Sequence, residues 1–105
     1  MIVTTTETIS GKKITRVIGL VKGNSVRARH LGRDILAGLR NLVGGEISDY
    51  TKAIAETREQ ALDRMIESAR AQGANAIICM RFTTSSLMQG AAEILAFGTA
   101  VVMED

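Results

Sequence analysis

The longest regular pattern of apolar residues in the chain lies between residues 48 and 72. Apolar side chains recur there every three or four positions, which is the spacing of one helix face, and charged residues occupy most positions between them. Ser48 or Asp49 can cap the start, and Gly73 can adopt the left-handed conformation that ends a helix. We therefore predict an amphipathic helix that runs to about Gln72. Its predicted buried positions are Ile54, Ala61, Leu62, Met65, Ile66 and Ala69.

Four shorter apolar stretches have the length and composition of β-strands. Residues 2–5 and 14–23 precede the long helix, and residues 76–80 and 92–103 follow it. The stretch 76–80 is apolar at every position, which is typical of a strand that is buried on both faces. The last stretch is also apolar on both faces. We interpret the polar residues 83–90 as a loop or a frayed strand end.

Glycines interrupt two of the predicted strands. Gly19 lies inside the strand at 14–23, which indicates a bulge, and Gly98 interrupts the last strand in the same way. Simple alternation would place Ile14, Ile18 and Leu20 on one face of the earlier strand and Thr15, Val17 and Val21 on the other.

A second helical pattern opens near Leu31 and closes before Gly44. It contains two internal glycines, each of which weakens a helix by about 1 kcal/mol relative to alanine, so this helix must rely on tertiary packing. The resulting order is strand, strand, helix, helix, strand, strand (ββααββ). It predicts an α+β domain in which a mostly antiparallel four-stranded sheet packs on helices. Residues 1–105 have the size of a single domain.

The last two predicted strands carry more apolar surface than the helices can cover. The long helix can shield one face of the sheet, whereas the helix with internal glycines is short and shields little of the other. We expect neighbouring copies of the chain to cover the remaining face. The pattern therefore predicts a closed homo-oligomer.

Composition and charge indicate which classes of partner and which cellular compartment to expect. Thirteen basic and eleven acidic residues leave a net charge of +2, but the first 40 residues hold eight basic and two acidic residues and the remainder holds five and nine. Three aromatic residues leave few platforms for base stacking, so we expect no nucleic-acid partner from composition alone. One cysteine, no signal-like start and no run of about 20 apolar residues favour a cytoplasmic protein without a membrane span.

Six runs of residues resemble the YbjQ-like family, which is often labelled heavy-metal-binding. The runs are Ile18–Gly23, Asp34–Arg40, Gly44–Ile47, Tyr50–Thr51, Gly73–Ala76 and Phe97–Val102, and together they extend over nearly the whole chain. The resemblance implies a subunit fold similar to that of dodecin and assembly into a ring, namely a pentamer. It implies no established activity.

A heavy-metal site requires several ligands of kinds that are rare in this sequence. Borderline and soft metal ions are bound by three or four thiolate and imidazole groups. The chain has one cysteine, Cys79, and one histidine, His30, without the spacing of a metal-binding motif. They are candidate ligands for a heavy-metal ion if symmetry-related copies bring them together. In mid-strand, however, Cys79 is more often an inert buried residue.

A basic patch offers an alternative binding surface. Arg27, Arg29, His30 and Arg33 are candidates to bind an anion, a nucleic acid or a protein partner, or to form salt bridges with acidic residues of a neighbouring copy. No nucleophile, base and orienting group can be combined around the single histidine, so we expect no enzymatic activity. We predict a non-catalytic oligomeric binding module that holds a metal ion or a small ligand at subunit interfaces, with the basic patch as the alternative site.

Overall fold

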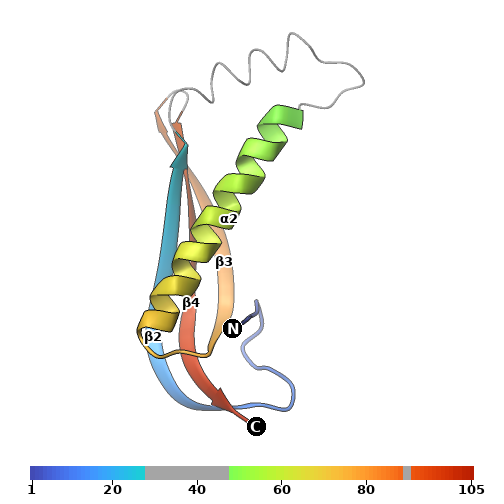
Figure 1. The fold of residues 1–105 in the computed structure, drawn as a ribbon, viewed down its shortest axis with the longest axis vertical. Coiled ribbons are helices and arrows are strands. Elements are labelled where there is room, and N and C mark those ends of the chain that lie inside the picture. Colours follow the sequence, from blue (N-terminus) through green and yellow to red (C-terminus); the bar gives the residue numbers. More distant parts are fainter. Residues whose placement is uncertain (28–47, 89–90) are drawn as a thin grey trace.

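The computed structural model describes residues 1–27, 48–88 and 91–105, which contain four strands and one helix. The elements are β1 (Ile2–Val3), β2 (Lys13–Arg27), α2 (Ser48–Ala71), β3 (Ala76–Met88) and β4 (Ala91–Glu104). The strands form one sheet in the order β1-β3-β4-β2 (Figure 1). β1 runs parallel to β3, and the other two pairings are antiparallel. The expected α+β class is confirmed, with a mixed sheet. The helix expected between Leu31 and Val43 lies outside the described residues.

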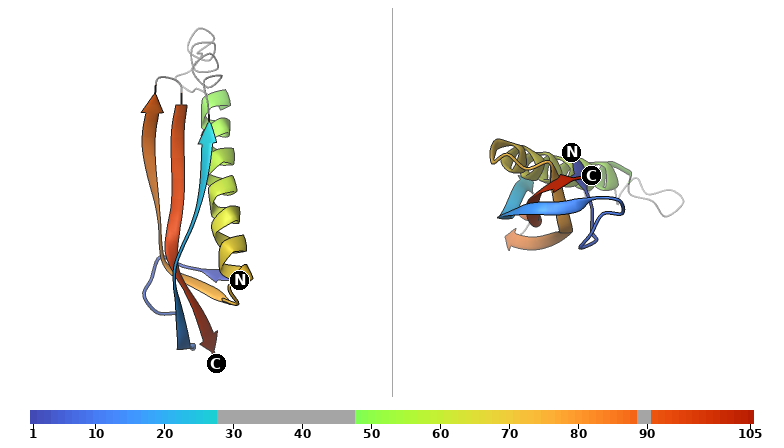
Figure 2. Two further views of the ribbon diagram at one scale, coloured as in Figure 1. Left: turned by 90° about the vertical axis from the view of Figure 1, so that its left-hand side faces the viewer. Right: turned by 90° about the horizontal axis from the view of Figure 1, so that it is seen from below.

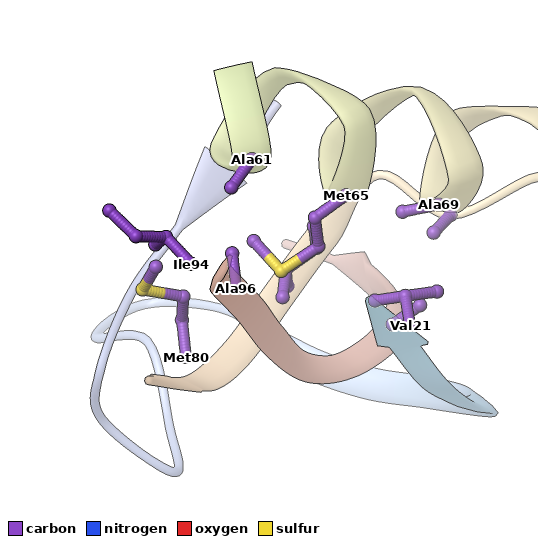
Figure 3. Packing of buried hydrophobic residues seen from close by; sticks show 10 residues of the cluster. Val21, Ala61, Met65, Ala69, Met80, Ile94 and Ala96 are labelled. Atoms are coloured by element: carbon purple, nitrogen blue, oxygen red, sulfur yellow. The ribbon is translucent and has the colours of Figure 1, made fainter. Parts of the chain in front are cut away.

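The long helix α2 covers one face of β2 and β4 (Figure 2). Ala61, Met65 and Ala69 are fully buried, and Ile54, Leu62 and Ile66 pack against the same core, so the predicted buried stripe is confirmed. Figure 3 shows Met65 and Ala69 reaching from α2 toward Val21 of β2 and Ala96 of β4. Helix and strand approach closely because β2 has a glycine at the contact: a Cβ atom on Gly23 would lie 2.3 Å from the backbone nitrogen of Met65.

The end of α2 follows the sequence prediction. Gly73 has a φ of 88°, and its N–H donates to the carbonyl of Arg70 at 3.0 Å, while the N–H of Ala74 donates to the carbonyl of Ala69 at 3.0 Å. These two bonds form the Schellman motif that glycine permits. Asn75 then binds β4: its side-chain amide donates to the carbonyl of Met103 at 2.8 Å, and its side-chain oxygen accepts from the Met103 N–H at 2.7 Å. The helix is therefore tied directly to the sheet.

Strand β2 contains the predicted bulge at Gly19, together with a second irregularity after Ile14. The expected division of its side chains between the two faces is wrong. Leu20 is 68% exposed, whereas Val21 is 2% exposed and shares the core with Ile18. A bulge adds one residue to a strand, so simple alternation fails across it.

Strand β3 continues where the sequence indicated a loop. It reaches Met88, and Thr83 pairs with Leu95 of β4. The expectation of a loop or frayed end at residues 83–90 is thus wrong as far as Met88. β-branched threonines favour strands even when they are polar, and exposed strand positions accept polar side chains.

The sheet has a second, smaller core on the face opposite α2. It consists of Ala76, Ile78, Val101 and Met103, with Ile9 and Ile14 packed against it. Residues 4–12, the N-terminal segment, run beside β3, where Cys79 and Met80 donate backbone hydrogen bonds to the carbonyls of Thr6 and Thr4, both at 3.0 Å. Near the chain ends, the sheet is therefore covered on both faces by the chain itself.

Candidate functional site

On the face of the sheet opposite α2, β2 carries exposed apolar side chains along its length, and β4 carries half-buried ones beyond the N-terminal segment. Residues paired across neighbouring strands point to the same face. We use the name open face for Val17, Leu20, Lys22 and Val26 of β2 together with Leu95 and Phe97 of β4. Leu20 is 68% exposed, Val17 63% and Val26 46%. Leu95 and Phe97 of β4, which pair with Asn24 and Lys22, are half-buried. This is an apolar surface on a strand at the edge of the sheet.

Polar groups lie among these apolar residues. Phe97 pairs with Lys22 on one side and with Arg81 on the other, so two cationic residues flank the aromatic residue in one row. Arg81 is anchored, because its Nη1 donates to the carbonyls of Thr5 at 3.0 Å and Met80 at 2.8 Å. Lys22 is exposed and has no hydrogen-bond or ion-pair partner among the residues that the structure describes. One cation on the open face is therefore available to a partner.

A second polar pair lies next along the same face. The side-chain amide of Asn24 donates to Oε2 of Glu93 at 3.1 Å. Lys22, by contrast, pairs with Phe97 and lies beside Leu20, and its nearest neighbours on β4 itself are uncharged. The open face thus combines apolar side chains with a free positive charge, a composition that suits contact with an acidic, partly apolar protein surface.

Cys79, one of the two candidate metal ligands, lies in a bulge of β3. Cys79 and Met80 lie opposite the single residue Gly98 of β4, and Cys79 has a φ of 54°. Its thiol is half-buried and lies 3.8 Å from the carbonyl oxygen of Thr6. The sequence placed Cys79 correctly in a strand, but it is less buried than expected because the bulge changes the direction of the chain. The interruption expected at Gly98 is absent: β4 continues through it, and the bulge lies opposite, in β3.

The described residues of the chain do not fit a heavy-metal centre. Across residues 1–27, 48–88 and 91–105, no three side chains of the His, Cys, Asp and Glu types come close enough together to hold a metal ion. His30, the other candidate ligand, lies outside the described residues. Cys79 therefore contributes a single thiol with a backbone carbonyl beside it, whereas heavy metals require several converging ligands.

The predicted basic patch lies almost entirely outside the described residues. Arg27 is the last residue of β2, and Arg29, His30 and Arg33 fall in the range that the structure does not describe. The open face is a candidate site whose residues were not identified from the sequence, although an uncovered sheet face was expected. Its signal was present in the apolar residues of 14–23, but alternation without a bulge placed Leu20 and Val21 on the wrong faces. Within the described part of the chain, no helix has the length and apolar character to cross a membrane.

Comparison with known proteins relates the whole chain to one family. The family model described as "Putative heavy-metal-binding" matches residues 1–104. A UPF0145 protein of Dehalococcoides mccartyi is 57% identical over 104 residues, which cover 99% of this chain and 100% of that protein. A UPF0145 protein of Clostridioides difficile is 54% identical over 105 residues, covering 100% of this chain and 94% of that protein. These names state no reaction.

A solved structure has a similar fold. It is the crystal structure of a protein with unknown function from Pediococcus pentosaceus, which belongs to the DUF74 family. The two structures superpose with a TM-score of 0.65 at 17% sequence identity, and the match covers 99% of this chain and 98% of the other. At this identity the likeness concerns the fold.

Proposed function

Since the chain belongs to the YbjQ-like family of UPF0145 proteins, we propose that it is a non-catalytic binding module that works as a closed homo-oligomer. The resemblance to the family favours a dodecin-like subunit of order ββααββ and a ring of five copies. A ligand, either a metal ion or a small molecule, would bind where two copies meet. The partner of the chain in this proposal is therefore the chain itself.

The open face is the observation that supports this proposal. Leu20 and Val17 are more than 60% exposed although they belong to a strand of the central sheet. Contiguous exposed apolar residues on a soluble protein mark interaction surfaces. Burying one leucine side chain stabilises a contact by about 1.5–3 kcal/mol. Two such residues in each copy, together with Val26 and Phe97, would contribute substantially to self-association.

A site between copies also reconciles the family description with the residues present. One subunit supplies a single described thiol, that of Cys79, and symmetry multiplies every residue by the number of copies in the ring. Cys79 is half-buried rather than sealed in the core. A heavy-metal ion would need such a shared site, and a small organic ligand would need only the groove between two copies.

Replacement of Leu20 by glutamate tests the assembly. We expect wild-type protein to elute with a mass of several subunits of 11.3 kDa in chromatography coupled to light scattering, and Leu20→Glu to shift toward the single-subunit mass. The buried charge would oppose the contact. Gln72→Glu, which adds the same charge at an exposed position beyond α2, serves as the control and should leave the mass unchanged. A Leu20→Glu protein of wild-type mass would contradict the proposal.

Metal binding is tested separately by calorimetry. Zinc, copper and cadmium ions are titrated into the wild type and into Cys79→Ala. The metal version predicts binding to the wild type that is lost in Cys79→Ala, at a stoichiometry below one ion per subunit. If no ion binds the wild type, the ligand is not one of these metal ions. The proposed oligomer is then tested by its measured mass alone.

A further inference from the structure

Strand β2 lies at the border of the sheet, and one of its two edges has no strand beside it (Figure 1). Among the described residues, β4 is the only strand that pairs with β2. Both irregularities of β2 lie between residues 14 and 19, and from Gly19 to Val26 the pairing with β4 keeps one register. Bulges discourage a further strand from pairing at an edge. The regular stretch at residues 19–26 lacks this protection.

The hydrogen bonds of β4 show which backbone groups of β2 face this edge. The carbonyl of Val101 accepts from the N–H of Asn75, which directly precedes β3, at 3.1 Å. Backbone groups of successive residues alternate between the two sides of a strand, and β4 has no extra residue in either of its pairings. Leu95 therefore directs its backbone groups to β3, as Val101 does. Its partner Asn24 on β2 must then direct its own backbone groups away from β4.

A side chain of α2 binds this side of β2. Nη1 of Arg64 donates to the carbonyl oxygen of Asn24 at 2.5 Å, as expected for a carbonyl that β4 does not use. By the same alternation, the backbone groups of Leu20, Lys22 and Val26 also face outward. We call the outward N–H and carbonyl groups of these four residues the outer edge. Within the described part of the chain, Arg64 makes the one side-chain hydrogen bond to it.

We propose that the outer edge binds an extended peptide segment of a partner protein, which joins the sheet as a strand antiparallel to β2 and places an acidic residue opposite Lys22. In strand addition of this kind, main-chain hydrogen bonds supply affinity and side chains at alternate positions supply specificity. A peptide N–H would replace Arg64 as the donor to the Asn24 carbonyl. The proposal does not depend on self-assembly through the open face, because the outer edge lies in the plane of the sheet.

The side chains of the outer edge indicate the sequence of the partner. Leu20, Lys22 and Val26 are exposed. Side chains directly opposite each other on paired strands are in contact, so apolar residues fit opposite Leu20 and Val26, and a carboxylate fits opposite Lys22. Strand β2 of a second copy would instead bring another lysine to the edge, and lysine discourages the pairing of identical edges. The charge therefore favours an acidic partner strand over a second copy.

A fluorescently labelled peptide tests the strand addition. It carries valine, threonine, glutamate and valine at alternate positions, to lie opposite Val26, Asn24, Lys22 and Leu20, with serine between them. Fluorescence anisotropy measures its dissociation constant for the wild-type protein. We expect saturable binding that is lost when the valines and the glutamate are N-methylated, because their N–H groups face β2. N-methylation of the serines, whose N–H groups face away, should leave binding unchanged.

Charge exchange tests the acidic residue. Lys22→Glu should raise the dissociation constant about tenfold or more, because like charges then face each other, and a peptide with lysine in place of glutamate should restore binding. Lys13→Glu is the control: it makes the same change at an exposed position of β2 before the irregularities and should bind as the wild type does. Arg64→Ala should bind the acidic peptide more tightly than the wild type, because it removes the competing donor.

Circular dichroism of every variant establishes that the protein is folded. The proposal would be overturned by a wild type without saturable binding, by equal effects of the two methylation patterns, or by a Lys22→Glu variant that binds like the wild type. Weaker binding by Arg64→Ala would also contradict it. A peptide with the sequence of residues 19–26 that binds more tightly than the acidic peptide would identify a second copy as the occupant instead. The proposed assembly is judged separately, by the mass of Leu20→Glu.

Discussion

The two ends of the sheet differ in how completely one subunit covers them. Near the chain ends, α2 packs on one face and the N-terminal segment on the other, and Val101 and Met103 of β4 are buried. Further along the same strand and on the same face, Leu95 and Phe97 are only half-buried. The strand is equally apolar in both places. What differs is the presence of the N-terminal segment over one end and its absence from the other.

This difference shows that apolar composition alone does not indicate which part of a sheet is buried within the chain. Ile78 and Leu20 are both large aliphatic residues on the face opposite α2, yet Ile78 is 8% exposed and Leu20 is 68% exposed. The first stabilises the fold of one subunit. The second remains mostly exposed beside the described residues, so its apolar surface is available for a partner.

The largest effect on stability is expected at Gly23, because α2 and β2 are in close contact there. Gly23→Val would drive a side chain into the backbone of Ala61 and Met65 and force the helix away from the sheet. We expect the free energy of unfolding to fall by about 3 kcal/mol or more, measured by urea denaturation. Asn24→Val at the next, exposed position is the control. Equal stability of the two variants would mean that helix and strand are not in close contact.

Paired truncations sharpen the comparison between the two ends. Ile78→Ala should lower the free energy of unfolding by about 2–4 kcal/mol, because it leaves a cavity in the covered core. Leu20→Ala should change it by less than about 0.5 kcal/mol when measured below the concentration of self-association. Equal losses in the two variants would show that Leu20 is already packed inside a single subunit.

A smaller effect is expected at Asn75, which connects the end of α2 to β4. Asn75→Ala removes the bonds of 2.8 and 2.7 Å to Met103 and leaves two backbone groups without partners. We expect a loss of about 1–3 kcal/mol in thermal or urea denaturation. Asn75→Asp keeps the accepting oxygen and should lie between the wild type and Asn75→Ala. An Asn75→Ala variant as stable as the wild type would contradict a stabilising role of the hydrogen bonds between Asn75 and Met103.

The smallest effect concerns the covered end at acidic pH. The Lys12 ammonium, 2.7 Å from Asp105, lowers the pKa of that carboxyl by a hydrogen bond and by its charge. A carboxyl whose pKa is lowered by folding adds stability above its unfolded pKa, and this is lost as pH falls through the folded value. The difference in Tm between wild type and Asp105→Asn should be slight at pH 6, smaller still at pH 2 and reduced by salt. A constant difference across this range would exclude the ion pair as its source.

The sequence was most informative where one local rule determined the structure. The stripe of α2 and its end at Gly73 follow from helix periodicity and from the conformation that glycine allows, so both were predictable. The bulge at Gly19 was predicted as well. Its consequence for Leu20 and Val21 was not, because alternation was continued across the extra residue. Residues 83–88 were misjudged because their polar character outweighed the strand preference of threonine.

The candidate site was harder to predict, because it depends on contacts distant in sequence. Nothing local to Leu95 distinguishes it from Val101. The distinction comes from Ile9, about 90 residues away, which packs only over the end that contains Val101. Composition predicted that a sheet face would need a partner, and the fold shows which part of that face is exposed.

The mass of the wild-type protein in solution tests most directly whether the open face is an interface. Light scattering at micromolar concentration should give a multiple of the 11.3 kDa subunit mass, about 57 kDa for a ring of five. A single-subunit mass under the same conditions would contradict self-assembly through the open face.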